Sequence, residues 1–198
     1  MNYKKAFDYT VALIVLLLSG GILILGLILA SIDTKSFGLF KQQRIGRYGK
    51  PFTIFKIKTI NDKTKSSSWL GKVLRATKLD ELPQLCNILN GTMSFVGPRP
   101  DIAGYADQLQ GEDRIILQVR PGITGLASIK YRNEEELLKN QPHPAHYNDT
   151  IIWPDKVRIN KWYVQNQSFA IDIKILFFTL LPSLLDIENF MTQNTKIK

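Results

Sequence analysis

The chain has 198 residues, with 26 Lys and Arg against 17 Asp and Glu, and a formal net charge of +9 at pH 7. This length allows one compact domain with an appendage, and an apolar content of 44% excludes a disordered polyelectrolyte. One Cys and two His argue against a disulfide framework and against a zinc site built on these residues. The positive charge predicts an anionic partner, but composition does not choose between nucleic acid, anionic lipid and a phosphorylated substrate.

A long apolar segment lies near the N-terminus. Residues 11–30 contain no charged side chain, and twenty such residues are long enough to cross a bilayer as a helix. Basic residues lie on both sides, so the positive-inside rule draws both ends toward the cytoplasm. The Ser-Gly-Gly at residues 19–21 is the weakest helix former in the segment, and a break there would give a re-entrant hairpin in one leaflet. An ordinary span, with the glycines serving helix packing, is the alternative that these residues leave open.

The next part of the chain carries most of the positive charge. Residues 41–78 include eleven basic side chains and one acid, Asp62. A strand is predicted over residues 52–60, with Lys56 and Lys58 on one face. Two lysines on one face could hold a diphosphate, but lysines also protect edge strands and attract anionic headgroups.

A polar loop at residues 61–68 precedes a predicted helix over residues 69–76. A second helix is expected to begin near Leu79 or Asp80, because Pro83 is tolerated only in the first turn, and to end at Gly91. Its N-terminus would favour the ionised form of Asp80, although an ordinary N-cap role would also explain an Asp there. Cys86 is expected to be buried against the apolar face of this helix.

Two rigid turns follow, and each contains an arginine. Pro98 and Pro100 enclose Arg99, and Arg120 opens a Pro-Gly turn that runs to residue 125. Arginine suits the planar recognition of phosphate, and glycine-rich turns can present backbone N–H groups to an anion. Near the C-terminus, residues 173–184 have apolar residues at helical spacing, which predicts an amphipathic helix facing either the core or a membrane interface. Pro182 would kink or end it.

Taken together, these segments resemble the bacterial sugar transferase family, the small monotopic phosphoglycosyl transferases. The resemblance covers nearly the whole chain in order. Its least matched part is about residues 134–159. The matching segments are residues 40–46, 55–59, 79–85, 91–100, 120–125 and 162–177.

The resemblance implies an α+β, mainly helical fold. Residues 1–34 would form a re-entrant membrane anchor, and residues 35–198 would form a cytoplasmic catalytic domain with a short sheet and interfacial amphipathic helices. Localisation at the cytoplasmic face of the bacterial inner membrane is expected, and a homodimer is left open. The family usually marks the helix break with Ser-Pro, whereas this chain has Ser19 followed by Gly20.

The implied reaction moves a sugar-1-phosphate from a UDP-sugar to undecaprenyl phosphate and releases UMP. It is a first step in building lipopolysaccharide, capsule or exopolysaccharide. Asp80 would be the nucleophile that forms a phosphosugar–aspartyl intermediate, Glu81 would be its partner, and both would lie near Mg²⁺. The residues expected to bind substrate are Lys56, Lys58, Arg99, Pro98, Pro100, Arg44, Arg120 and Arg132.

Some positions depart from the family pattern, and the residues leave two other functions open. Thr92 stands where Asp is common and Leu126 where Trp is common, which affects the donor sugar more than the reaction class. One alternative is a membrane-tethered module that binds anionic lipid or nucleic acid without catalysis, but it gives Asp80 and Glu81 no role. The other is a phosphohydrolase that uses water as acceptor. Nucleic acid is the partner least expected, because the basic block lies close to both the anchor and the acidic pair.

Overall fold

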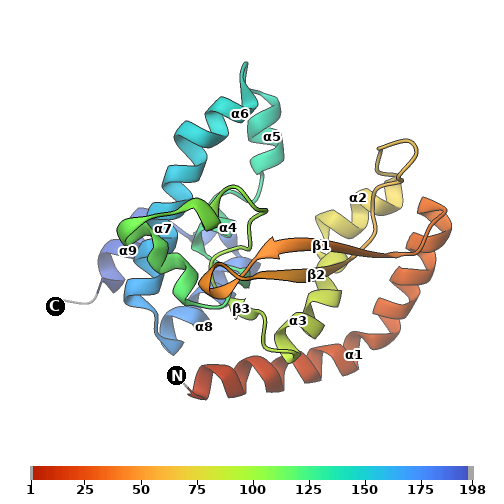
Figure 1. Ribbon diagram of the computed structural model, residues 1–198. Coiled ribbons are helices and arrows are strands. Elements are labelled where there is room, and N and C mark those ends of the chain that lie inside the picture. Colours follow the sequence, from red (N-terminus) through yellow and green to blue (C-terminus); the bar gives the residue numbers. More distant parts are fainter. Residues whose placement is uncertain (1, 196–198) are drawn as a thin grey trace. The chain divides into compact units, whose positions relative to one another are not determined.

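The computed structural model describes residues 2–195 and contains two compact units. The first unit comprises Met1–Arg44 and Pro51–Ser94, and the second comprises Ile45–Lys50 and Phe95–Lys198. The described residues are mostly helical, with two short two-stranded sheets (Figure 1). The expected α+β, mainly helical class is therefore confirmed.

Helix α1 (Asn2–Thr34) is the long apolar helix that the sequence predicted, and it is long and apolar enough to cross a membrane. It stays helical through residues 19–21, where Ser19 Oγ donates to the Val15 carbonyl at 2.6 Å, so the helix break expected there is wrong. The helix follows a wide curve instead (Figure 1). Its buried residues lie toward its two ends, whereas no residue between 13 and 25 is buried. These buried residues are Asp8, Ala12, Gly26, Ala30 and Thr34.

The remainder of the first unit places a short sheet beside three helical segments. The segments are β1 (Leu39–Ile45, whose last residue belongs to the second unit), β2 (Pro51–Ile57), α2 (Trp69–Ala76), the 3₁₀ helix η2 (Leu79–Gln84) and α3 (Leu85–Leu89). Ala30 of α1, Ile57 of β2 and Leu74 of α2 form a small core. Helix α2 matches its predicted range because the Ser68 hydroxyl caps it, accepting from the Gly71 N–H at 3.1 Å.

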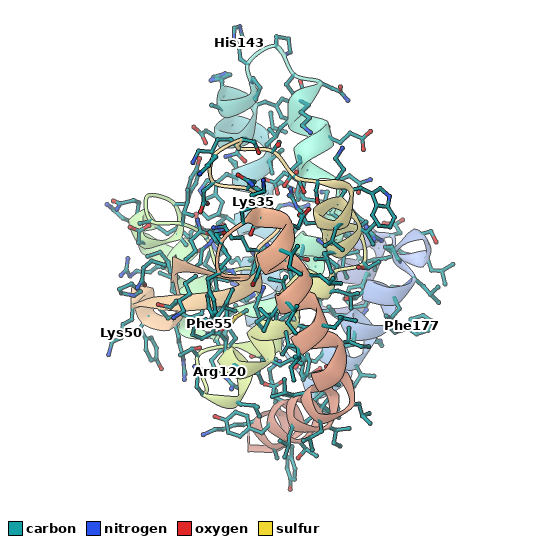
Figure 2. All side chains as sticks on the ribbon, turned by 90° about the vertical axis from the view of Figure 1, so that its right-hand side faces the viewer. Lys35, Lys50, Phe55, Arg120, His143 and Phe177 are labelled. Carbon is teal, nitrogen blue, oxygen red and sulfur yellow. The ribbon has the colours of Figure 1, made fainter. Side chains whose placement is uncertain are left out.

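The second unit is built on helices around a main apolar core and a smaller cluster of Ile45, Ala106, Ile116 and Leu117. Its described elements are η1 (Arg47–Gly49), β3 (Ser94–Val96, whose first residue belongs to the first unit), η3 (Ala106–Gln108), η4 (Gly111–Gln118), β4 (Gly122–Thr124), α4 (Leu126–Lys130), α5 (Glu134–Lys139), α6 (Pro144–Tyr147), the π-helical η5 (Asn148–Ile152), α7 (Trp153–Asn166), α8 (Phe169–Leu180), η6 (Pro182–Leu184) and α9 (Ile187–Asn194). The main core joins β3, α4, α7, α8 and α9. His143 lies at the tip between α5 and α6 (Figure 2).

Helix α8 corresponds to the predicted C-terminal helix and ends before Pro182. Its packed face consists of Ile171, Asp172 and Ile175. Most of the apolar stripe read from the sequence is exposed instead, and Phe177 projects outward in Figure 2. The exposed members are Ile173, Phe177, Leu180, Leu181 and Leu184. The sequence left open whether this stripe faces the core or a membrane interface, and these five side chains do not face the core.

Candidate active site

The acidic pair lies in the 3₁₀ helix η2 of the first unit. This helix begins after Lys78, which adopts a left-handed conformation with φ of 60°. The residue before the helix is therefore Lys78, and the N-cap role considered for Asp80 is wrong. Asp80 and Glu81 are both buried, with 7% and 6% of their surface exposed. Three residues per turn direct adjacent side chains of a 3₁₀ helix about 120° apart, so the two carboxylates can meet different partners.

Glu81 pairs with a lysine of the neighbouring strand. Lys56 Nζ on β2 lies 2.9 Å from Glu81 Oε1, and both side chains are largely shielded from water. The Asn87 side chain of α3 helps to fix this arrangement: its amide donates to the Thr53 carbonyl at 2.7 Å and accepts from the Phe55 N–H at 3.2 Å. Sequence reasoning missed Asn87, although a polar residue on an otherwise apolar helical face was a signal for it.

Asp80 differs from Glu81 in its hydrogen-bond partners. Its Oδ1 is buried and has no hydrogen-bond partner among the described residues. Burial raises the pKa of Asp80, and the charge of Glu81 raises it further, while Lys56, Lys78 and Arg75 oppose the change. The expectation that the helix N-terminus would favour the ionised form is therefore wrong in its net direction, because desolvation outweighs the dipole of a six-residue segment. A carboxylate that lacks a partner and is held near cations is suited to nucleophilic attack.

The other two basic residues predicted in this unit have local partners. Lys58 Nζ lies 2.5 Å from Asp62, and this hydrogen bond lowers the pKa of that carboxyl. Arg44 on β1 donates to Gln42 Oε1 at 2.7 and 3.0 Å. Lys56 is thus the predicted basic residue that the structure brings to the acidic pair. Cys86, expected to be buried, is exposed because the five-residue α3 turns it away from the packed side.

The remaining predicted residues lie in the second unit, where the two arginine turns form one structure. Strands β3 and β4 pair, and the Gly97 N–H donates to the Thr124 carbonyl at 3.0 Å while the Gly122 N–H donates to the Pro98 carbonyl at 2.8 Å. A Cβ on Gly97 would lie 2.5 Å from the Arg120 carbonyl oxygen, so only glycine allows this approach.

The paired turns present one arginine to solvent from a rigid base. Pro98, Pro100 and Pro121 are buried, whereas Arg99 is exposed and Arg120 is half-buried. Arg132 is exposed two residues after α4, separate from this pair of turns in sequence. The sequence identified both turns but gave no sign that they pair.

The acidic pair was also predicted to hold Mg²⁺. No group of three or more His, Cys, Asp and Glu that could hold a metal ion occurs within residues 2–195. Mg²⁺ is commonly bound by one or two carboxylates together with substrate phosphates and water, so a closed protein cage is not required. The buried Oδ1 of Asp80, which has no hydrogen-bond partner in the described part of the chain and lies beside Glu81 in the sequence, fits such an ion.

Comparison with known proteins adds independent evidence. The model of the bacterial sugar transferase family matches residues 1–185. The chain is 35% identical over 190 residues to an "uncharacterized sugar transferase EpsL" of Bacillus subtilis, covering 91% of this chain and 86% of that one. It is 34% identical to the UDP-glucose:undecaprenyl-phosphate glucose-1-phosphate transferase of Klebsiella pneumoniae, covering 94% of this chain and 41% of the relative.

A further relative acts on a different sugar according to its name. The undecaprenyl-phosphate galactose phosphotransferase of Salmonella typhimurium is 28% identical, and the match covers 89% of this chain and 39% of that protein. The chain therefore spans about two fifths of the length of these two named transferases.

Proposed function

Because this chain belongs to the bacterial sugar transferase family, we propose that it transfers a sugar-1-phosphate from a UDP-sugar to undecaprenyl phosphate and releases UMP. The names of the relatives support this donor and acceptor class, and they differ in the sugar. The observation that carries the proposal is the buried Asp80 with an unpartnered Oδ1 beside the Lys56–Glu81 ion pair. Such a reaction would start lipopolysaccharide, capsule or exopolysaccharide assembly.

In the first step, the Asp80 carboxylate attacks the sugar-linked phosphorus. A bond forms between that phosphorus and the Asp80 oxygen, and the bond to the bridging oxygen breaks, so that UMP leaves. In the second step, a phosphate oxygen of undecaprenyl phosphate attacks the same phosphorus and regenerates the carboxylate. A carboxylate nucleophile thus divides one displacement into two, which gives ping-pong kinetics.

Phosphoryl transfer depends mainly on positioning and on neutralising charge. Lys56 neutralises Glu81, so the acidic pair does not present two uncompensated charges to an anionic donor. We assign Arg99 to phosphate binding, with Arg44, Lys58, Arg120 and Arg132 as further substrate contacts. Mg²⁺ held by Asp80 and Glu81 would neutralise charge on the diphosphate when bound.

The position of α1 supports a re-entrant anchor. Near its start, Asp8 and Ala12 are buried. The Tyr9 hydroxyl packs so closely against Gly91 that a Cβ added to this glycine would lie 2.8 Å from it. Near its end, the Thr34 carbonyl accepts from the Asn61 amide at 3.2 Å. Both ends of α1 thus contact the same unit while the middle is exposed. A helix that crossed the ~30 Å hydrocarbon layer would separate its ends on opposite sides. We propose that the catalytic part faces the cytoplasm at the inner membrane.

The test is a UMP-release assay with undecaprenyl phosphate across a panel of UDP-sugars. Asp80→Asn should abolish turnover and the radiolabelled sugar-phosphate adduct. Asp113→Asn makes the same change at a half-exposed carboxylate paired with Lys161, and it should retain turnover. An Asp80→Asn enzyme with near-normal turnover would exclude the nucleophile assignment.

The same assay separates the alternative functions. UMP release that requires the polyprenyl phosphate indicates transfer, whereas release without it indicates hydrolysis. A wild-type protein that binds anionic vesicles but releases UMP from no donor would instead support a binding module.

A further inference from the structure

A buried polar network lies directly beneath the arginine turns of the second unit. Tyr163 of α7 and Asp172 of α8 are 2% and 3% exposed, and the Tyr163 hydroxyl lies 2.6 Å from Asp172 Oδ1. The same hydroxyl accepts from the Gln167 amide at 2.9 Å, and its one proton is shared between Asp172 and the Val96 carbonyl oxygen, which lies 3.2 Å away. Asp172 and Gln167 therefore meet at the Tyr163 hydroxyl, and that hydroxyl reaches the Val96 carbonyl.

That carbonyl belongs to the residue that leads into the first arginine turn. Val96 ends β3, and Gly97, Pro98 and Arg99 follow it directly. The second turn is held in a similar way, because Thr124 Oγ1 at the end of β4 lies 2.8 Å from Thr179 Oγ1 of α8. Helix α7 thus bonds to the last residue of β3, and helix α8 bonds to the last residue of β4.

Packing alone does not explain these polar groups. Val96, Ile171 and Ile175 belong to the apolar core around them, and a Phe at position 163 would fill nearly the same volume as Tyr. Burying a carboxyl and a hydroxyl in such surroundings costs free energy unless both are hydrogen-bonded. What the hydroxyl adds is a directional bond to the backbone, and satisfied buried networks make local structure rigid.

We propose that Tyr163 and Asp172 are positioning residues that hold the Val96 carbonyl and thereby place the guanidinium of Arg99 for a substrate phosphate. The inference rests on the proposed function, because it gives Arg99 the role of phosphate ligand. Neither residue touches substrate: they act through the backbone of β3. Small displacements of a binding group have large effects on phosphoryl transfer, which depends on position.

The test is a double-mutant cycle measured by two readouts, kcat/KM for the UDP-sugar and the Kd for UDP. Tyr163→Phe should weaken both by about tenfold. In an Arg99→Ala background the same substitution should have little further effect, because the guanidinium that Tyr163 positions is absent. Tyr105→Phe is the control, because it removes the same group from a tyrosine whose hydroxyl bonds to Asp149 at 3.1 Å and to Asn148 at 3.2 Å, neither of which belongs to β3 or β4. It should leave both readouts unchanged.

Other outcomes would overturn the proposal. Equal losses from Tyr163→Phe in both backgrounds, or a lower Tm with unchanged kcat/KM and Kd, would show a purely structural role. Asp172→Asn keeps an acceptor for the hydroxyl and should retain more UDP affinity than Asp172→Leu; equal affinities would count against the network. If wild type binds UDP but never releases UMP, the proposed function fails while the binding cycle still decides the positioning role.

Discussion

The contact between the two arginine turns can be tested by adding one methyl group at Gly97. In Gly97→Ala the new Cβ would lie 2.5 Å from the Arg120 carbonyl oxygen, 3.0 Å from the Gly122 nitrogen and 3.2 Å from the Pro121 carbonyl carbon. All three atoms belong to the backbone, so no side-chain rotation can relieve the clash. Ordinary contact begins at 3.4 Å, which means that the turns must separate by about 0.9 Å.

The expected cost follows from this separation. Overpacking costs about 1–3 kcal/mol. The two backbone hydrogen bonds between the turns would weaken, at about 1 kcal/mol each. The sum is roughly 3–5 kcal/mol, which lowers Tm by on the order of 10 °C in a chain of this size. Moving a phosphate-binding arginine by this distance should reduce kcat/KM by about 100-fold.

Thermal unfolding in detergent and the UMP-release assay measure the two effects. Gly20→Ala is the control, because it adds the same methyl group where no atom lies within 4 Å. It should lower neither the Tm nor kcat/KM, because Ala favours the helix at this position. A Gly97→Ala protein with wild-type Tm and activity would refute the close approach of the two turns.

Three further predictions concern the first unit. Asp80→Asn should have a higher Tm than wild type at pH 7.5, because a carboxyl with a raised pKa destabilises the native state as it ionises. The difference in Tm should disappear below pH 3.8, the ordinary pKa of Asp. A lower Tm of the variant at pH 7.5 would contradict the raised pKa. Lys56→Met should shift the acid limb of the pH profile of kcat/KM to higher pH, since the charge of Lys56 lowers the pKa of Asp80; an unmoved limb would exclude this coupling. In a Cys86→Ser background, Tyr3→Cys and Phe37→Cys should both be shielded from an impermeant thiol reagent in intact cells and react after permeabilisation. Reaction of Tyr3→Cys alone in intact cells would establish a span.

Local signals in the sequence predicted much of the first unit. The helix at residues 69–76 has a Ser cap and apolar spacing of its own, so its range needed no tertiary information. The η2 segment was harder, because the left-handed Lys78 and the 3₁₀ geometry depend on packing against β2. The same holds for the pKa of Asp80, since burial is a property of the folded chain and its sign opposed the local expectation.

Non-local pairing limited the prediction of the second unit. Each arginine turn could be recognised from its prolines and glycines, but Gly97 and Thr124 are far apart in sequence, and pairing between them leaves no local pattern. Helix α8 shows a related limit. It has apolar residues on most sides, so periodicity could not tell which face would meet α7 and which would stay exposed.

We propose that the exposed apolar side of helix α8 rests on the membrane, which would make the lipid environment a variable of the enzyme. One side carries exposed Phe169, Ile173 and Phe177, while another side bonds to Tyr163 of α7 through Asp172 and to Thr124 of β4 through Thr179. A rigid helix cannot shift on one side without shifting on the other. Detergent micelles and bilayers, which press differently on the exposed side, should therefore give different donor affinities for the same protein, and kinetic constants are comparable only within one lipid phase.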